Sequence, residues 1–170
     1  MPSQLLHTDS AGEAHPPDLL AVHFEEPAAD GGAALLADAV DVLRVLRSEF
    51  PDTFSRLSAN SNAVIRSGPS VYDGPFLTPL PDDLWYFRFR PDLDPGNGIP
   101  TSDLCAIAQT IGASMHVLSL DANAGYVCKN ERWLHGRTAW TGSRVSARLL
   151  INIDPTLRRA RGMVGRGLQL

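Results

Sequence analysis

The sequence has few of the features that stabilise small domains covalently. Its 170 residues include only two cysteines, Cys105 and Cys128. Two cysteines are too few for a disulfide framework, and they do not form the Cys-x-x-Cys pair of a structural zinc site. We therefore expect two buried free thiols and a fold that depends on a packed core.

Long hydrophobic runs are also absent from the sequence. No stretch approaches the roughly 18 uninterrupted apolar residues of a membrane-spanning helix. Residues 1–6 have neither the charged segment nor the apolar run of a signal peptide. The sequence thus predicts a cytoplasmic protein with no membrane partner.

The sequence also lacks a strong excess of charge of either sign. Lys and Arg number 15 and Asp and Glu number 19, a net charge of −4. This mildly acidic balance argues against a nucleic-acid partner. The basic cluster near the C-terminus predicts a short exposed tail at residues 156–170, after one domain; its members are Arg158, Arg159, Arg161 and Arg166.

What is present indicates a strand-rich globular domain. The hydrophobic share is 44%, with 14 glycines and 13 prolines, which favours many turns. Two helices are expected, one at residues 38–49, capped by Asp38 and stopped by Pro51, and one starting with Thr101 as its cap. Strands are predicted at 19–24, 63–65, 84–90, 116–120, 126–129 and 145–153, and loops at 67–83 and 92–100.

Both helices are predicted to be amphipathic. The buried stripe of the second is expected to contain Leu104, Ile107, Ala108, Ile111 and Met115. Short strands with two interposed helices favour a β-sandwich or jelly roll decorated by helices.

Alternation along the strand at 84–90 predicts two different faces. Phe87 and Phe89 share one face, whereas Tyr86, Arg88 and Arg90 share the other. The two arginines are expected on a solvated face, although they are also candidates for contact with an anionic substrate.

The first residues that indicate chemistry are His7 and Asp9. In an extended segment, residues two apart lie on the same face, so one metal ion can bind both. His135, in a polar-rich insertion expected at 130–140, is the best candidate for a third ligand. Two histidines and one carboxylate leave open positions on an octahedral metal, as in non-haem Fe(II) oxygenases. On its own, His-x-Asp is equally compatible with an exposed polar N-terminus.

The sequence around His135 makes the pattern more specific. Residues 130–140 read Asn-x-x-x-x-His-Gly-Arg-Thr-Ala-Trp, preceded by Gly31-Gly32, the helix at 38–49 and the early His-x-Asp. This order resembles the taurine dioxygenase-like (TauD/TfdA-type) branch of the Fe(II)- and 2-oxoglutarate-dependent dioxygenases. The resemblance implies a mainly β double-stranded β-helix, or jelly roll, with helical insertions, and an iron site made of His7, Asp9 and His135.

The resemblance also implies two cosubstrate arginines. Arg148, thirteen residues after His135, would hold the distal carboxylate of 2-oxoglutarate, and Arg144 the end near the iron. A planar guanidinium supplies fixed charge and a two-pronged donor array for a carboxylate. For Arg148, an internal salt bridge is the alternative. Ala33 and Ala34 stand where relatives often have a hydroxyl residue that also binds the cosubstrate, which should weaken that site.

The activity so implied is hydroxylation, or another oxidation, of an unactivated carbon of a small molecule with O2, giving succinate and CO2. Two alternatives stay open. One is a catalytically silent relative that acts as an interaction module or is a gene fragment. The other is a cupin-like metal enzyme that does not use 2-oxoglutarate.

The position of His7 leads to a further expectation. Relatives usually have a substantial portion before this motif, so residues 1–155 are expected to be the C-terminal portion of a dioxygenase jelly roll that is incomplete at its N-terminus. Missing strands leave an open sheet edge with unpaired backbone groups. We therefore expect that the chain either self-associates, as a homo-oligomer that covers this edge, or binds iron poorly.

Overall fold

The computed structural model describes residues 1–59, 64–80, 84–91, 100–157 and 163–164. The described chain is mainly β with three helices, α1 (Ala39–Glu49), α2 (Pro51–Ser58) and α3 (Thr101–Ala113). Its strands are β1 (Gln4–His7), β2 (Leu19–Glu26), β3 (Asp30–Gly31), β4 (Ala34–Asp38), β5 (Val64–Ser67), β6 (Ser70–Asp73), β7 (Leu77–Leu80), β8 (Leu84–Phe87), β9 (Met115–Leu118), β10 (Ala124–Lys129), β11 (Trp133–Arg137), β12 (Trp140–Thr141), β13 (Val145–Ile151) and β14 (Met163–Val164).

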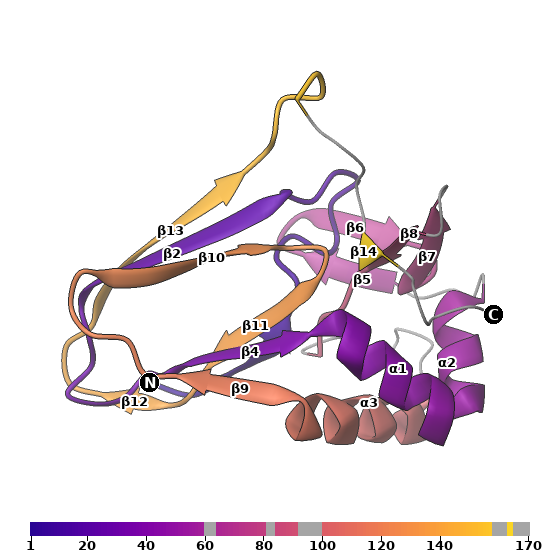
Figure 1. Cartoon of the computed structure of the whole chain (residues 1–170), viewed down its shortest axis with the longest axis horizontal. Coiled ribbons are helices and arrows are strands. Elements are labelled where there is room, and N and C mark those ends of the chain that lie inside the picture. The colour runs from indigo at the N-terminus through magenta and orange to yellow at the C-terminus, as the bar shows by residue number, and fades with distance from the viewer. Residues whose placement is uncertain (60–63, 81–83, 92–99, 158–162, 165–170) are drawn as a thin grey trace.

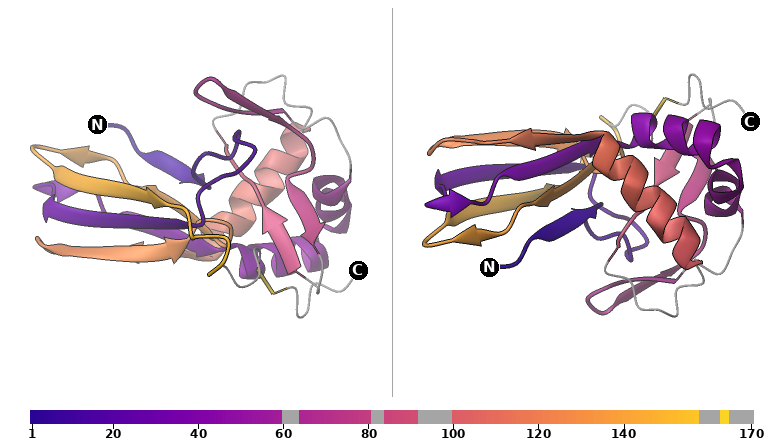
Figure 2. Two further views of the ribbon diagram at one scale, coloured as in Figure 1. Left: turned by 90° about the horizontal axis from the view of Figure 1, so that it is seen from above. Right: turned by 90° about the horizontal axis from the view of Figure 1, so that it is seen from below.

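Two antiparallel sheets face each other, with strand orders β1-β11-β4-β9 and β10-β2-β13. Figures 1 and 2 show them as two layers, with the helices and strands β5 to β8 at the end opposite the β3–β12 pair. Strands of each sheet come from distant parts of the chain, as the order β1-β11 shows. This is the predicted jelly roll with helical insertions.

The turn before β4 depends on two glycines. Gly31 and Gly32 have φ angles of +73° and +71°, which only glycine adopts without strain. A Cβ on Gly31 would also lie 2.0 Å from the Ala139 carbonyl oxygen. The Gly-Gly pair therefore lets β3 lie directly against β12.

The first predicted helix is confirmed in position and in capping. The Asp38 side chain accepts a hydrogen bond from the Val40 amide at 3.0 Å, and α1 ends at Phe50. Pro51 begins α2, where its missing amide proton is not needed. One side of α1 is buried in the main core, together with Phe54, Phe76, Phe87 and Ile107.

The expectation of a loop at 67–83 is wrong for its described part. Residues 70–73 and 77–80 form β6 and β7, which pair with β5 and β8. Pro79 obscured this pattern, but β7 is an edge strand of its sheet, where a missing donor is tolerated. Residues 81–83 and 92–99, and Ala63 in the predicted strand at 63–65, lie outside the described residues.

The second predicted helix forms, with Ile107 and Ile111 buried and Leu104 and Met115 partly buried as part of the predicted stripe, but its cap and the position of Ala108 differ from the expectation. Pro100, not Thr101, precedes the first turn, and no side chain caps it. Asp103 is buried because it accepts hydrogen bonds from Thr53 at 2.7 Å and from Arg56 at 2.6 Å, both on α2. This polar anchor turns the helix so that Ala108 is exposed; the buried residues are Asp103, Ala106, Ile107, Thr110 and Ile111.

Three smaller findings complete the fold. Cys128 is buried as expected, but Cys105 is exposed, and both are free. Met163 and Val164, within the range predicted as a tail, pair with β8. Of the helices in the described part of the chain, none has the length and apolar character needed to cross a bilayer.

Candidate metal centre

The pairing of β1 with β11 brings the early and late histidines together. His7 and His135 are cross-strand partners, although 128 positions separate them in the sequence. His135 is on β11, between β1 and β4, so the expectation that residues 130–140 form an insertion between strands is wrong for 133–137, and also for Trp140, which begins β12. A central strand holds the ligand more rigidly than an insertion would.

Three buried side chains converge at this point of the sheet. His7, Asp9 and His135 are each 4% exposed, and each offers a ligand atom within 4.8 Å of the others. His7 Nε2 lies 3.6 Å from Asp9 Oδ1, and His135 Nε2 lies 3.3 Å from Asp9 Oδ2. Ligand atoms about 2.1 Å from one ion at right angles would be about 3 Å apart, so small movements would accommodate a metal.

Backbone carbonyls orient both imidazole rings. His7 Nδ1 lies 2.8 Å from the Leu5 carbonyl oxygen, and His135 Nδ1 lies 3.3 Å from that of Trp133. With a metal bound, a proton on each Nδ1 would donate to its carbonyl, and the Nε2 atoms, which face the cluster, would be the ligand atoms. This is the usual arrangement of a metal-binding histidine.

Two atoms of the cluster indicate what the site is suited to hold. Asp9 Oδ2 and His135 Nε2 are buried, and neither forms a hydrogen bond in the described part of the chain. Buried polar atoms without partners are costly and rare in folded proteins. A divalent cation would satisfy both atoms at once, so this donor set fits a metal ion.

The surroundings keep Asp9 ionised. Burial on its own raises the pKa of Asp9, but the imidazoles of His135 and His7 and the Arg148 guanidinium together lower that pKa below its usual range. Arg148 Nη1 donates to Asp9 Oδ1 at 3.0 Å, and half of the Arg148 side chain is exposed. A carboxylate, not a carboxylic acid, is the form that binds a metal.

The backbone of the His-x-Asp segment is fixed on both sides. Asn130 is fully buried. Its side-chain Nδ2 donates to the backbone carbonyl oxygen of Asp9 at 3.0 Å, and its side-chain Oδ1 accepts from the backbone amide of Asp9 at 2.8 Å. Thr8 and Phe89 exchange backbone and hydroxyl hydrogen bonds of 2.8 to 3.3 Å. Sequence reasoning had placed Asn130 in the motif without a role, because its partner is 121 residues away.

Arg88 holds the segment that follows Asp9. Its guanidinium is buried, contrary to the expectation of a solvated face, and donates to the carbonyl oxygens of Ala11, Glu13 and Ala14. It also lies 4.1 Å from the centre of the Tyr72 ring. Carbonyl oxygens and aromatic faces therefore satisfy this buried cation. Phe87 and Phe89 lie on the same side, as predicted, and their rings stack in the core.

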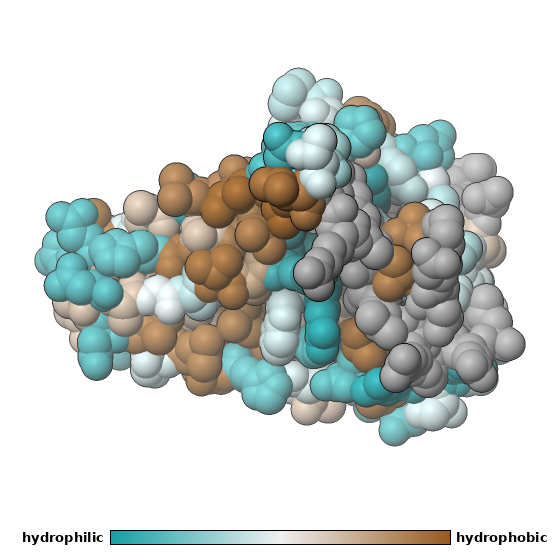
Figure 3. All heavy atoms as spheres, turned by 45° about the horizontal axis from the view of Figure 1, so that its top comes forward, coloured by the Kyte–Doolittle hydropathy of each residue, from teal (hydrophilic) through white to brown (hydrophobic). Residues whose placement is uncertain are grey.

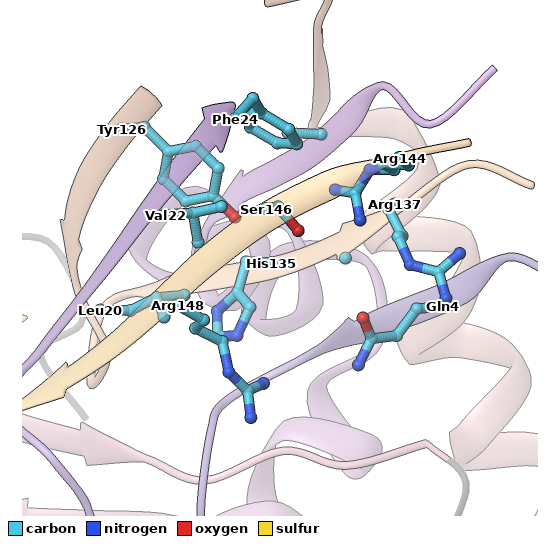
Figure 4. A pocket seen from close by; sticks show the side chains of 12 residues that line it. Gln4, Leu20, Val22, Phe24, Tyr126, His135, Arg137, Arg144, Ser146 and Arg148 are labelled. Atoms are coloured by element: carbon cyan, nitrogen blue, oxygen red, sulfur yellow. The ribbon is translucent and has the colours of Figure 1, made fainter. Parts of the chain in front are cut away.

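A cavity of about 220 Å³ lies between the two sheets next to His135. Figure 4 shows Arg148 near His135, with Arg137 and Arg144 at the opposite end. Tyr126 also lines the cavity, and burial, aided by Cys128 and Asp9, raises the pKa of its phenol, which therefore stays a protonated donor.

Arg144 and Arg148, four residues apart on the β13 side of the cavity, serve different ends of it. Arg148 reaches the His-Asp-His cluster through Asp9. Arg144 instead lies over the Phe24 ring, 4.9 Å from its centre, and its buried Nε has no hydrogen-bond partner in the described residues. The cavity thus has one cation at the cluster, Arg148, and two at the opposite end, Arg137 and Arg144.

Comparison with known proteins defines the family. The sequence matches the family described as "Taurine catabolism dioxygenase TauD, TfdA family" over residues 1–151, so the chain belongs to that family. A search of curated proteins found no match.

Solved structures share the fold. An asparagine oxygenase in complex with Fe(II), 2S,3S-3-hydroxyasparagine and succinate superposes with a TM-score of 0.75 and 20% identity, over 89% of this chain and 50% of that one. The non-heme iron oxygenase OrfP gives 0.65 and 16%, over 88% and 52%. PvcB from Pseudomonas aeruginosa gives 0.69 and 16%, over 91% and 59%. This chain therefore spans only about half the length of the first two.

Proposed function

We propose that the chain is an Fe(II)- and 2-oxoglutarate-dependent oxygenase that hydroxylates, or otherwise oxidises, an unactivated carbon of a small molecule. The observation that carries this proposal is the buried convergence of His7, Asp9 and His135, two of whose ligand atoms have no hydrogen-bond partner in the described chain. These three residues would hold the ferrous ion on one face and leave the opposite positions open.

Arg144, which directly precedes β13, and Arg148, on β13, would hold the cosubstrate. The position of each supports an assignment opposite to the one expected from the sequence. Arg148, beside Asp9, is suited to the end of 2-oxoglutarate that chelates the metal, and Arg144, at the far end of the cavity, to the distal carboxylate. The buried Nε of Arg144, which has no hydrogen-bond partner among the described residues, would then gain an acceptor.

When bound, iron and 2-oxoglutarate supply the oxidising chemistry, with O2 consumed and succinate and CO2 released. The protein's own residues have supporting roles. Leu20, near Arg148, gives the cavity an apolar wall at the end beside the metal centre, which helps to exclude water there. The neutral phenol of Tyr126 can donate to a cosubstrate oxygen without adding charge.

Anaerobic spectroscopy tests the proposal. Fe(II) with 2-oxoglutarate should give the weak visible charge-transfer band of the chelate, and His135→Ala should abolish it. Arg66→Ala, at an exposed site on β5, is the matched control and should leave it unchanged. No band with all three ligands intact would favour the silent relative. Iron binding with no response to 2-oxoglutarate or to Arg148→Ala would favour a cupin-like enzyme.

The silent alternative is supported by one surface feature. β13 is the edge strand of its sheet, and all seven of its residues are exposed, Leu149 by 62%. Figure 3 shows apolar side chains gathered over this side of the molecule. A second copy that covers this edge would make the chain an interaction module and a homo-oligomer whether or not it binds iron.

A further inference from the structure

A second cavity, of about 380 Å³, lies between the end of β1, the residues that follow β8 and one face of α3. Figure 2 shows the end of β1 next to α3. This cavity shares no lining residue with the one that Arg144 and Arg148 line, and none of the three candidate metal ligands lines it. It is therefore separate from the candidate metal centre and its cosubstrate cavity.

Small residues on α3 leave this space open. Ala108 and Gly112, about one turn apart, are exposed and line the cavity. A Cβ on Gly112 would meet no heavy atom within 4 Å beyond its own helix backbone. The most buried lining residues are Leu6, Phe89 and Ile111, all members of the main hydrophobic core. The cavity is thus an unfilled extension of that core with well-packed walls.

The chemistry of the lining excludes a charged ligand. Among the described residues that line the cavity, none has a charged side chain, and the Cys105 thiol, a weak donor, is the most polar group. A charged molecule would lose its hydration here without gaining a hydrogen-bond partner. A hydrocarbon group would instead gain free energy by leaving water. The cavity is therefore suited to an uncharged apolar group.

The size of the cavity indicates a small molecule rather than another protein chain. Its volume is within the range of about 300–1,000 Å³ that is usual for small-molecule sites. Ten described residues line it, whereas a stable protein interface has about 20–30 residues on each side. In Figure 1, the exposed β13 edge lies at the top and α3 at the bottom, so a second copy paired along β13 would not cover the cavity.

We propose that this cavity is a binding site for an uncharged apolar small molecule, or for the hydrocarbon part of one. The bound group would take the space that larger side chains on α3 would otherwise fill. It would also shield Leu5, which lines the cavity and is 60% exposed. The site requires no metal and goes beyond the proposed function.

The test titrates the full chain, without added metal, with N-phenyl-1-naphthylamine, a neutral probe whose fluorescence rises in apolar surroundings. Gly112→Leu places a side chain in the cavity and should weaken probe binding about tenfold or more. Ala113→Leu, at the next exposed position and outside the lining, is its matched control. Ala108→Glu puts a charge in the cavity and should also weaken binding, whereas Gln109→Glu adds the same charge outside it. Circular dichroism checks that every variant is folded.

Alkylation locates the bound probe. Cys105 lines the cavity and is exposed, whereas Cys128 is buried. Saturating probe should therefore slow the reaction of Cys105 with iodoacetamide in the natural sequence. In Gly112→Leu, the same probe concentration should have little effect on that rate.

The outcomes decide between this site and other locations for the probe. Losses confined to Gly112→Leu and Ala108→Glu, with slower alkylation of Cys105, support the site. No binding, equal losses in the two controls, or unchanged alkylation would overturn the proposal. Displacement of the probe at equal concentration by the charged analogue 8-anilinonaphthalene-1-sulfonate would contradict the uncharged ligand class.

Two further measurements separate the alternatives. If sedimentation shows dimers that Gly112→Leu dissociates, a second copy occupies the cavity and the proposal is wrong. The Fe(II)–2-oxoglutarate band is measured independently. Its absence beside cavity-specific probe binding would contradict the proposed function and leave this site supported.

Discussion

Asn130 and Asp9 hold each other by two hydrogen bonds across 121 residues of sequence. The Asn130 amide nitrogen donates to the Asp9 carbonyl oxygen, and the Asn130 oxygen accepts from the Asp9 amide. The same amide nitrogen also donates to the carbonyl of Pro17 at 3.1 Å. The buried Asn130 side chain thus fixes the backbone of the candidate ligand Asp9 and also that of Pro17, at the end of the segment after Asp9.

Replacing Asn130 by Ala should therefore weaken both the metal site and the fold. We expect Fe(II) affinity to fall about ten- to a hundredfold, as for other residues that orient metal ligands. Because backbone groups of Asp9 would be buried without partners, the free energy of unfolding should fall on the order of 3 kcal/mol. Anaerobic calorimetry with Fe(II) and urea denaturation measure the two effects.

Asp103→Asn is the matched control, since it removes a buried acid at the α2–α3 contact, away from the metal ligands. It should reduce stability without changing Fe(II) affinity. If Asn130→Ala and Asp103→Asn lost Fe(II) affinity equally, general destabilisation would explain the loss and the positioning role of Asn130 would be wrong.

Gly136, next to His135, should not tolerate a larger residue. A Cβ at this position would lie 2.5 Å from the Gln4 carbonyl oxygen, closer than real Cβ atoms approach a neighbour's backbone, and in tight contact with the Leu5 backbone at 3.1 Å. Gly136→Ala should push β1 away from β11 and separate His7 from His135. We expect loss of Fe(II) binding with the helices intact. Unchanged affinity in calorimetry would show that β1 can shift without disturbing the ligands.

Much of this fold follows from local patterns in the sequence. Leu19 to Phe24 predicted β2, and Asp38 predicted the start of α1, because apolar runs and caps act over a few residues. The β6–β7 region and the turned face of α3 could not be predicted. Pro79 is tolerated only because β7 is an edge strand, and Asp103 is buried only because Arg56 lies opposite it on another helix.

The candidate site, like the fold, was predictable from the sequence only in part. The resemblance based on the motif around His135 was sufficient to name the three candidate ligands and the two arginines, Arg144 and Arg148. Which end of the cavity each arginine occupies depends on its neighbours in space. Arg148 lies at the metal end because it pairs with Asp9, and Arg144 lies at the far end, over the Phe24 ring. Spacing along a strand does not contain that information. Likewise, the exposure of Cys105 follows from the orientation of α3.

A shortened cosubstrate should distinguish the two arginines. Arg144→Ala should weaken 2-oxoglutarate binding about ten- to a hundredfold, since it removes the charged partner of the distal carboxylate. It should have no effect on 2-oxobutyrate, which lacks that carboxylate. Arg148→Ala should weaken both acids. Titration of the anaerobic charge-transfer band measures all four affinities, and the reverse pattern would restore the assignment of Arg148 to the distal end.

The exposed β13 edge predicts concentration-dependent association. Leu149, on β13, is 62% exposed, and Val127, on β10 at the other edge of the same sheet, is 66% exposed; an edge strand with apolar side chains favours pairing with another chain. Sedimentation should show dimers or larger species at micromolar concentrations, and Leu149→Lys should shift the distribution toward monomer. Ser48→Lys, on an exposed part of α1, adds the same charge as a control. A monomer with a full complement of iron would contradict the expectation that the chain either associates or binds iron poorly.

Acid should weaken the α2–α3 contact through Asp103. Hydrogen bonds from Arg56 and Thr53 lower the pKa of this carboxyl below its ordinary value of 3.8, despite the opposing effect of burial. Because the unfolded chain then takes up the proton first, the stabilisation is complete above about pH 4 and is lost as the pH falls through the lower pKa of the folded state. Asp103→Asn should remove this dependence, so its unfolding free energy should approach that of the natural sequence as the pH falls from 4 toward 2. Urea titrations of both proteins across that pH range measure the difference between their unfolding free energies. The contributions of the other carboxylates are the same in both proteins and cancel in this difference. Parallel curves would mean that the ion pair with the half-exposed Arg56 is screened by solvent and contributes no pH-dependent stability.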